Sequence, residues 1–276
     1  TWDRAANHTH GNISDDGQIG AAIGRIITTG LGGTLQAMAG NEAGEMLYWS
    51  GTQWIRLSPG IDGQSLVFKD GKPTWWPEVT GSNVVVNHAT GRVWMDRNLG
   101  ASRIATSSTD ASSYGYLYQW GRDGDGHQLR SSGTTNKQST DNTPGHDKFI
   151  TVSFIPTDWR NPQNNNLWQA NGTNNPCPSG YRVPTRAEWE FERLSWKSDD
   201  PAGAFGSVLK LPMAGRRGST TGSLFDVGTV GCYWTSTVEL FGSFYLNIEN
   251  AGINEADVEF QSGDRASGRS VRCIKE

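Results

Sequence analysis

The last fifth of the chain, residues 233–276, constrains the fold most, because apolar and polar residues alternate strictly along two stretches of it. Three large apolar residues alternate with polar ones over 243–249, and 257–261 repeats the pattern. Successive side chains of a β-strand point to opposite faces, so this period of two predicts half-buried strands. The predicted buried face consists of Phe244, Leu246, Ile248, Val258 and Phe260. The opposite face mixes aromatic, amide, hydroxyl and carboxylate groups, which suits contact with a partner, although a solvated sheet face would show the same alternation.

The composition indicates a loop-rich fold with a core of a few large side chains. Only 35% of the 276 residues are hydrophobic, whereas glycine (35) and tryptophan (12) are abundant. Glycine allows tight turns, and each tryptophan buries a large apolar area. The net charge of −4, without a dense basic patch, argues against nucleic-acid binding. Every apolar run is far shorter than the ~20 residues of a membrane-spanning helix.

Residues 1–43 are polar, rich in Gly, Ala and Thr, and only weakly patterned. Such a segment cannot bury a core of its own. It is therefore expected to be an extended segment that depends on neighbouring chains.

Residues 44–80 contain a degenerate repeat, in which residues 44–54 are echoed by residues 63–75. Each unit predicts a hairpin, with a short alternating strand, a turn containing glycine and a strand that ends in an aromatic residue. A single hairpin is not stable alone in water, and two remain marginal. The apolar face is thus expected to pack against other copies of the chain, as in the trimeric phage and bacterial fibre proteins whose repeat this segment resembles. A monomeric β-rich linker is the alternative.

Residues 81–276 are predicted to form one α+β domain. Two strands are expected at residues 84–86 and 91–95, further strands at the C-terminus, and one clear helix between them. The helix should begin after Thr185, since Thr185 and Glu188 form a capping box. Its expected apolar face consists of Ala187, Phe191 and Leu194. A polar tract over 122–175 is long enough to carry function or to wrap the core.

Five sequence blocks follow one another in this domain, at residues 91–100, 114–121, 176–190, 233–237 and 268–273. Together they resemble the family of C-type-lectin-fold domains that includes the Fibrobacter succinogenes major paralogous domain. The resemblance extends to the variable proteins of phages and bacteria that diversity-generating retroelements diversify, and more distantly to formylglycine-generating enzymes. It implies a C-type lectin fold head, preceded by an extended β-rich trimeric fibre stem.

The resemblance also implies where a ligand binds. In the diversified proteins, the ligand-contacting residues lie between the Tyr-Trp-Ser-Ser-Thr block and the final Ser-Val-Arg-Cys block. Phe241 and Tyr245 are the expected anchors, because aromatic side chains give large contact areas at low entropic cost. The expected ligand-binding residues are Cys232, Glu239, Phe241, Ser243, Tyr245, Asn247, Glu249, Asn254, Asp257, Glu259, Gln261, Asp264 and Ser267. Their carboxylates favour a cationic or hydroxyl-rich partner.

The expected function is host receptor binding by a homotrimeric attachment protein at the tip of a phage tail fibre. The chain would then belong to the virion, and its partner would be a protein or a glycan on the bacterial surface. A bacterial cell-surface adhesin of the same fold is the alternative. A third possibility is an oxidase of the formylglycine-generating type.

An enzyme is not expected. The oxidases that share this resemblance use a closely spaced cysteine pair near the C-terminus, whereas Cys232 and Cys273 are far apart in sequence. His127 and His146 lie in polar stretches without a nucleophile motif, so both are interpreted as loop histidines. Asp123 and Asp125 suggest calcium only superficially, because an EF-hand loop needs further ligands and a distal glutamate.

One metal site is expected, and only in a trimer. In an extended strand, His8 and His10 would point the same way. Three parallel chains would supply six nitrogens, a set that suits a transition metal such as iron. This arrangement resembles the His-x-His sites in the needles of phage tail fibres. No other cofactor is expected.

The three cysteines allow one internal disulfide and leave an odd thiol. Cys177 and Cys273 both lie in blocks that carry the resemblance, whereas Cys232 lies among the expected variable positions. A disulfide is therefore expected between Cys177 and Cys273, although free buried thiols at both positions are also compatible with the sequence.

Overall fold

The computed structural model describes residues 43–60, 65–76, 83–249 and 257–276. The chain divides into two compact units, the first of residues 1–61 and 68–74 and the second of residues 62–67 and 75–276. His8, His10, Asn254 and almost all of the predicted segment 1–43 lie outside the described residues.

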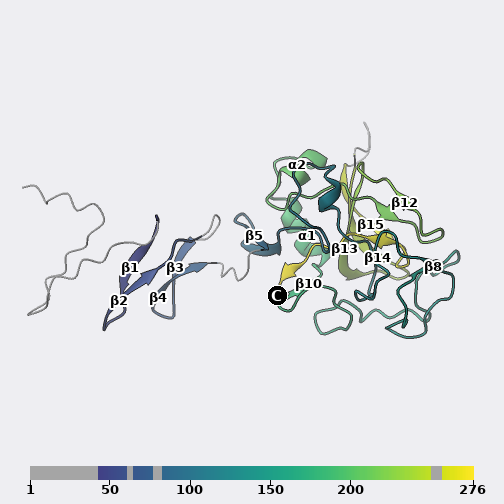
Figure 1. Cartoon of the computed structure of the whole chain (residues 1–276), viewed down its shortest axis with the longest axis horizontal. Coiled ribbons are helices and arrows are strands. Elements are labelled where there is room, and N and C mark those ends of the chain that lie inside the picture. The colour runs from purple at the N-terminus through teal and green to yellow at the C-terminus, as the bar shows by residue number, and fades with distance from the viewer. Residues whose placement is uncertain (1–42, 61–64, 77–82, 250–256) are drawn as a thin grey trace, which may run out of the picture. The chain divides into compact units, whose positions relative to one another are not determined.

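Two hairpins occupy the degenerate repeat (Figure 1). Strand β1 (Met46–Trp49) pairs antiparallel with β2 (Trp54–Leu57), and β3 (Ser65–Lys69) shares a two-stranded sheet with β4 (Lys72–Trp76). The second hairpin turns at Asp70 and Gly71, which both have positive φ. Asp-Gly is a preferred pair for such a turn because both central residues must be left-handed.

Apolar side chains of both hairpins are exposed in this chain. Trp49 and Trp54 pack edge to face with their rings 5.6 Å apart, yet remain 54% and 38% exposed. Phe68 is 80% exposed and Leu66 is 41% exposed. A hairpin that leaves its largest apolar groups in water gains little from burial.

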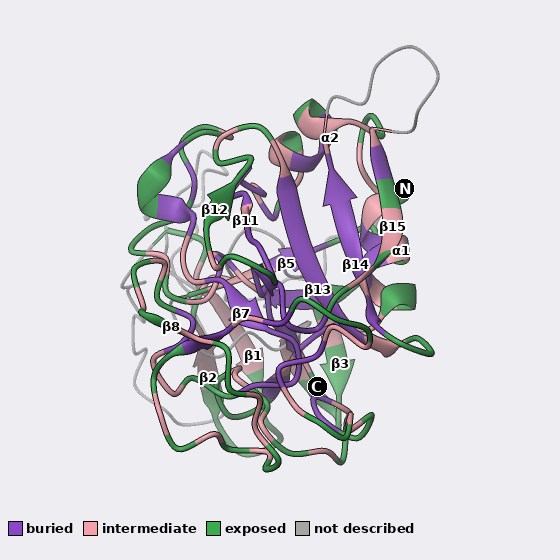
Figure 2. Cartoon of the chain, turned by 90° about the vertical axis from the view of Figure 1, so that its right-hand side faces the viewer, coloured by how far each residue is buried: buried purple, intermediate pink, exposed green. Residues whose placement is uncertain are grey.

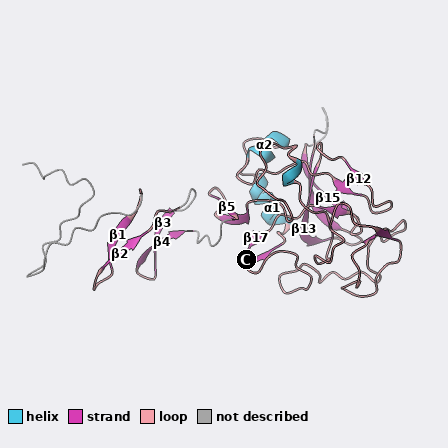
Figure 3. Cartoon of the chain, in the orientation of Figure 1, coloured by secondary structure: helices cyan, strands magenta, loops and turns pink. Residues whose placement is uncertain are grey.

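Residues 83–249 and 257–276, which we call the head, consist mostly of small sheets joined by loops, and these residues contain two short α-helices and one 3₁₀ turn (Figure 3). One four-stranded sheet has the order β10 (Tyr181–Arg182), β17 (Ile274–Lys275), β6 (Arg92–Met95) and β5 (Val84–Asn87). It brings the first and last strands of the head together. Val93 and Trp94 of β6 are buried, while Arg92 is exposed.

The central sheet is three-stranded, with β14 (Ser243–Ile248) between β13 (Gly231–Val238) and β15 (Val258–Gly263). All neighbouring strands are antiparallel, and a bulge interrupts the register of β13 and β14 between Trp234 and Val238. Strands β13 and β14 are almost wholly buried (Figure 2).

The remaining strands are two residues long and serve to fix loops. A second four-stranded sheet has the order β12 (Leu224–Phe225), β11 (Arg216–Arg217), β16 (Gly268–Arg269) and β7 (Tyr118–Gln119). Strands β8 (Thr134–Thr135) and β9 (Phe149–Ile150) pair in parallel within the long polar tract. A 3₁₀ turn, η1, covers Ala111–Ser113.

Helix α1 (Arg186–Arg193) begins as the sequence predicts. The Thr185 side chain accepts a hydrogen bond from the Glu188 backbone, and the Glu188 carboxylate accepts one from the Thr185 backbone. These reciprocal bonds confirm the capping box. The second helix, α2 (Pro201–Gly206), has Asp200 at its N-cap and proline at its first position.

The predicted apolar face of α1 is wrong. Phe191 and Leu194 are 67% and 70% exposed, whereas Trp189 and Glu192 are fully buried. Trp189 fixes the rotation of the helix, because its ring packs 4.9 Å from that of Trp94. Residues three apart share a helix face, so Glu192 follows Trp189 inward. Its carboxylate is satisfied there by a 2.7 Å hydrogen bond from the Asn87 amide.

Six fully buried tryptophans form the expected core: Trp94, Trp120, Trp159, Trp168, Trp189 and Trp234. Four of their indole N–H groups donate to backbone carbonyls, which satisfies the polar atom that each ring carries inward. Two of the six, Trp159 and Trp168, come from the polar tract over 122–175. That tract therefore wraps the core and contributes to it.

A disulfide joins Cys177 to Cys273, with Cα atoms 5.9 Å apart, and Cys232 is a buried free thiol. This is the pairing that the sequence favoured. The bond ties the segment before α1 to the last strand region of the head. Neither helix in the described part of the chain is long and apolar enough to cross a bilayer.

Candidate functional site

The central sheet does not present the open face that its alternating sequence predicts. Ser243, Tyr245 and Asn247 are 0%, 7% and 5% exposed, and Cys232 and Ser267 are also buried. These five residues were expected to contact a ligand, and the structure contradicts that expectation. A strand packed on both faces can alternate between polar and apolar residues just as a half-solvated strand does, so the pattern alone could not distinguish the two.

Each face of the sheet packs against its own hydrophobic cluster. Leu246, Ile248 and Val258 join Trp94 and Trp189 in one cluster. On the other face, Cys232 and Tyr245 join a second cluster built around tryptophans of the polar tract and of β13. The polar tract thus supplies the cover that the sequence pattern did not reveal.

Tyr245 is held by aromatic and cationic contacts. Its ring lies edge-on to Trp234 at 5.9 Å, and the Arg269 guanidinium lies 3.8 Å from its centroid and 4.4 Å from that of Trp234. The phenol hydroxyl donates to Gln261, and burial raises its pKa. Tyr245 is therefore part of the packing of the sheet and cannot act as a surface anchor.

The other buried residues of the expected site are also bound within the chain. The Ser243 hydroxyl accepts a 3.1 Å hydrogen bond from Arg265. The Asn247 amide donates to Glu249 at 2.6 Å and its oxygen accepts a weak bond from the Cys232 thiol. The polar side chains of Cys232, Ser243 and Asn247 are therefore engaged within the chain.

The remaining expected residues are spread along the sheet: Glu239, Phe241 and Asp264 lie near one end of β14 and β15, Glu249 and Asp257 near the other, and Glu259 and Gln261 within β15. Phe241 is 60% exposed, and Glu239, Glu259 and Asp264 are exposed as well. Glu249, Asp257 and Gln261 are half-buried. The turn between β13 and β14 therefore carries the most accessible part of the expected site.

Four exposed apolar side chains lie on two turns, and we call them the apolar turns: Phe154, Ile155, Leu240 and Phe241. Sequence reasoning found only Phe241. Leu240 and Ile155 are 76% and 82% exposed. An isolated Phe-Ile pair inside the polar tract was the available signal, but its exposure depends on the fold.

Buried Arg265 connects the two apolar turns. Its guanidinium donates to the Gly242 carbonyl at 2.9 and 3.0 Å and lies 3.6 Å from the Asp158 carboxylate. The next backbone N–H, of Ala266, donates to the Thr157 carbonyl at 3.1 Å. The segment just after β15 is therefore bonded to Gly242, which follows Phe241, and to residues 157–158, which follow the turn with Phe154 and Ile155.

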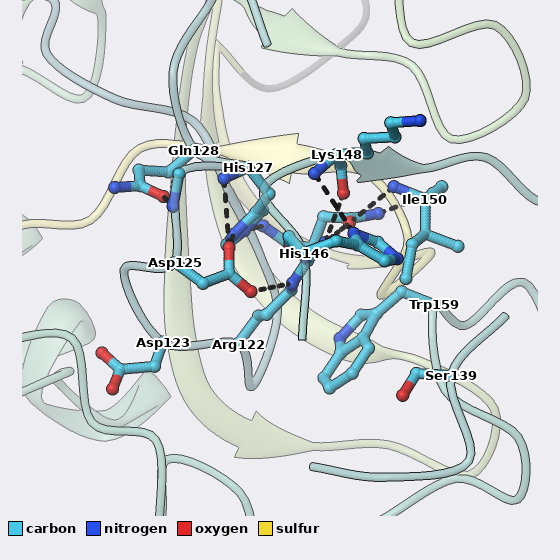
Figure 4. A network of polar contacts seen from close by, with 12 residues as sticks. Arg122, Asp123, Asp125, His127, Gln128, Ser139, His146, Lys148, Ile150 and Trp159 are labelled. Carbon is cyan, nitrogen blue, oxygen red and sulfur yellow. Dashed lines mark hydrogen bonds and ion pairs between the residues drawn. The ribbon is translucent and has the colours of Figure 1, made fainter. Parts of the chain in front are cut away.

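His127 belongs to a buried polar network (Figure 4). Its Nδ1 lies 2.7 Å from Asp125, and its Nε2 accepts a 3.1 Å hydrogen bond from the Gln119 backbone. The second Asp125 oxygen accepts from Arg122 at 2.8 Å. Burial is the main reason that the pKa of His127 is lowered to about 4.

This network is structural rather than catalytic. Both ring nitrogens of His127 are occupied, so the ring has no free base to offer a substrate. The interpretation of His127 as an ordinary loop histidine is wrong in one respect, because the side chain is fully buried. His146 is half-buried, and its Nδ1 accepts from the Lys148 backbone at 3.2 Å.

We predict that Tyr245→Ala lowers the free energy of unfolding by about 3 kcal/mol, since a buried aromatic side chain is removed from a packed core. Phe241→Ala should change it by less than about 0.5 kcal/mol, because that ring is exposed. Urea unfolding of both variants provides the measurement. Equal losses for the two variants would contradict the assignment of Tyr245 to the core.

We also predict that the head loses stability as the pH falls from about 6.5 to about 4. His127 has a pKa of 6.5 when unfolded and about 4 when folded, so within this window only the unfolded state binds the proton. The free energy of unfolding should drop by on the order of 3 kcal/mol across the window. His127→Gln should flatten this dependence in urea titrations at stepped pH; an unchanged slope would exclude His127 as its source.

No family model, curated protein or solved structure matches this chain. What the protein does must therefore be inferred from its own residues and their geometry.

Proposed function

We propose that this chain is an attachment protein that binds a receptor on a bacterial surface, at the tip of a phage tail fibre. The observation that carries the proposal is the pair of apolar turns. Four large apolar side chains are exposed on these turns. We place them in one interaction surface, because contiguous exposed apolar patches are typical of protein interaction sites. Glu239 precedes Leu240 in sequence, Asp264 precedes the connecting Arg265, and both carboxylates are exposed.

The receptor-binding surface in this proposal differs from the expected one. It keeps Glu239, Phe241, Glu259 and Asp264, adds the rest of the apolar turns, and omits the buried residues of β13 and β14. Phe241 remains an anchor. In this surface the apolar turns provide the apolar contacts, and Glu239, Glu259 and Asp264 provide negative charge. We therefore expect a receptor that carries cationic or hydroxyl groups around an apolar contact.

A C-type lectin fold is part of the proposal for the head. Its support comes from the five ordered sequence blocks, and from the pairing of strands at the two ends of the domain. The block at residues 268–273 contributes Arg269 and Arg272, which are both buried. These residues act in the core, which agrees with a scaffold role for the block.

A trimeric stem is also part of the proposal. Each hairpin leaves large apolar side chains in water, and two unassisted hairpins are marginally stable. Burial of Trp49, Trp54, Leu66 and Phe68 between three chains would remove that cost. In this arrangement His8 and His10 of three chains would hold a transition metal such as iron.

An oxidase of the formylglycine-generating type fits less well. Such chemistry needs reactive thiols, but Cys177 and Cys273 are bonded to each other. Cys232 is buried, and burial raises the pKa of its thiol to about 11. A thiol in this state is scarcely ionised near neutral pH and is a poor nucleophile. We therefore propose a binding protein rather than an enzyme.

The proposal predicts that the fluorescently labelled chain binds intact cells of at least one strain in a panel of bacteria. The double substitution Leu240→Ala with Phe241→Ala should weaken that binding at least tenfold, because two anchors are lost. Flow cytometry over a concentration series gives the apparent affinity. Phe191→Ala with Leu194→Ala is the matched control, since it removes the same two residue types at similar exposure on α1. Equal binding by the two double variants would reject the apolar turns as the receptor site.

The stem proposal predicts that the chain sediments as a trimer, at three times the 30.1 kDa of one chain. Phe68→Glu should shift the distribution toward monomers, because it would bury three carboxylates at the shared interface. Analytical ultracentrifugation distinguishes these states. A full-length chain that sediments as a monomer at micromolar concentration would overturn the trimer.

A further inference from the structure

Strand β15 forms one edge of the central sheet, and its pairing shows which of its backbone groups face outward. The Glu249 N–H donates to the carbonyl of Asp257, directly opposite it, at 2.8 Å. Hydrogen-bonded pairs alternate along antiparallel strands, so Glu259 and Gln261 also turn their backbone groups toward β14. The N–H and C=O groups of the residues between them therefore point away from the sheet: Val258, Phe260 and Ser262.

This outward row has no strand beside it. The sheet ends at β15, and within the described ranges no other backbone group bonds to Val258, Phe260 or Ser262. An open edge of this kind is a template for a further strand, and proteins usually cover or disrupt it. Here a groove follows the edge instead.

The groove lies between β15 and α1, which Figure 2 shows side by side. Its volume is about 910 Å³. Ala187, Val258 and Phe260 supply apolar wall, and Glu259 and Thr237 lie at its margin. Val258 and Phe260 of β15 thus line a groove that is large enough for several side chains of an extended segment.

Arg186 gives the groove its charge preference. Its guanidinium lies 4.6 Å from the Phe244 ring and 5.2 Å from the Phe260 ring. The other groove arginine, Arg193, is paired with Glu190 at 2.8 Å and with Asp199. Arg186 forms no ion pair with any described residue, although its charge helps to lower the pKa of Glu190, which also lines the groove. A carboxylate that enters the groove would share this charge with Glu190.

We propose that β15 accepts an extended segment of a partner protein as the fourth strand of the central sheet. The main chain of the segment pairs with Val258, Phe260 and Ser262. Every second side chain of the segment enters the groove. The apolar ones pack on Phe260, and one carboxylate forms an ion pair with Arg186. The side chains between them point to the other face of the sheet, beside Glu259. Lysine or arginine is favoured at these positions, since opposite charges stabilise cross-strand pairs.

A second copy of the chain suits this edge poorly. Residues 257–264 carry Asp257, Glu259 and Asp264 and contain no basic residue. Two such strands placed side by side would bring like charges together, which is destabilising. The outer edge of β15 shares Glu259 with the proposed receptor-binding surface, but the peptide test does not depend on host attachment.

The test begins with the selection of random nine-residue linear peptides, displayed on yeast, against the full chain. In the enriched sequences, apolar and basic residues should alternate, and one acidic residue should replace an apolar residue in this alternation. Failure to enrich any peptide that binds the chain would overturn the proposal.

The best peptide is then synthesised with single N-methyl groups at each backbone amide in turn. Methylation should weaken binding about tenfold or more at every second amide and have little effect between them, since only alternate amides face β15. A uniform response along the peptide would exclude strand addition. This arm alters the peptide alone, so it does not depend on how a protein variant folds.

Variants of the chain locate the site. Ser262→Pro removes one outward N–H and should weaken peptide binding about tenfold, whereas Ser262→Ala keeps the N–H and should bind as the unmodified chain does. Arg186→Gln should abolish the preference for the acidic residue. Unaltered peptide binding by Ser262→Pro, or self-association of the chain that this variant removes, would overturn the partner-peptide assignment.

Discussion

Burial of both faces of strands β13 and β14 is the constraint on which the rest of the head depends. One face packs on Trp94 and Trp189, and the other packs on tryptophans that include Trp120 and Trp159. The layer that contains Trp120 and Trp159 has little regular structure, since much of it comes from the long polar tract over 122–175. A sheet enclosed in this way fixes its own register, because a one-residue slip would exchange the two faces and mismatch both cores.

Buried arginines hold the irregular layer in place. Arg122 donates to the carbonyls of His146 and Lys148, and Arg217 donates to those of Ser132 and Gly222. Arg272 donates to the Leu209 carbonyl at 2.7 Å. Loop carbonyls lack a strand or helix partner, and a guanidinium with five N–H donors can satisfy several of them at once. This explains how a chain of low apolar content encloses six tryptophans.

This construction leaves only the periphery of the sheet for the recognition that we propose. The faces of β13 and β14 are committed to packing, so what remains accessible is the turns at the strand ends and the outer edge of β15. The turns expose apolar side chains, and the outer edge of β15 exposes a row of backbone N–H and C=O groups beside a groove. The two surfaces therefore suit different partners: the turns suit a folded receptor, and the edge suits an extended segment.

The sequence by itself determined what depends on neighbouring residues. The capping box at Thr185, the Asp-Gly turn of the second hairpin and the tryptophan core all follow from local chemistry or from large apolar area. Only the tertiary structure decided which side of an element faces water. Tyr245 is buried because Trp234 and Arg269 pack against its ring, and Phe191 is exposed because Trp189 sets the rotation of α1. Burial is a property of contacts between distant segments, and periodicity reports an alternation without saying what lies on either side of it.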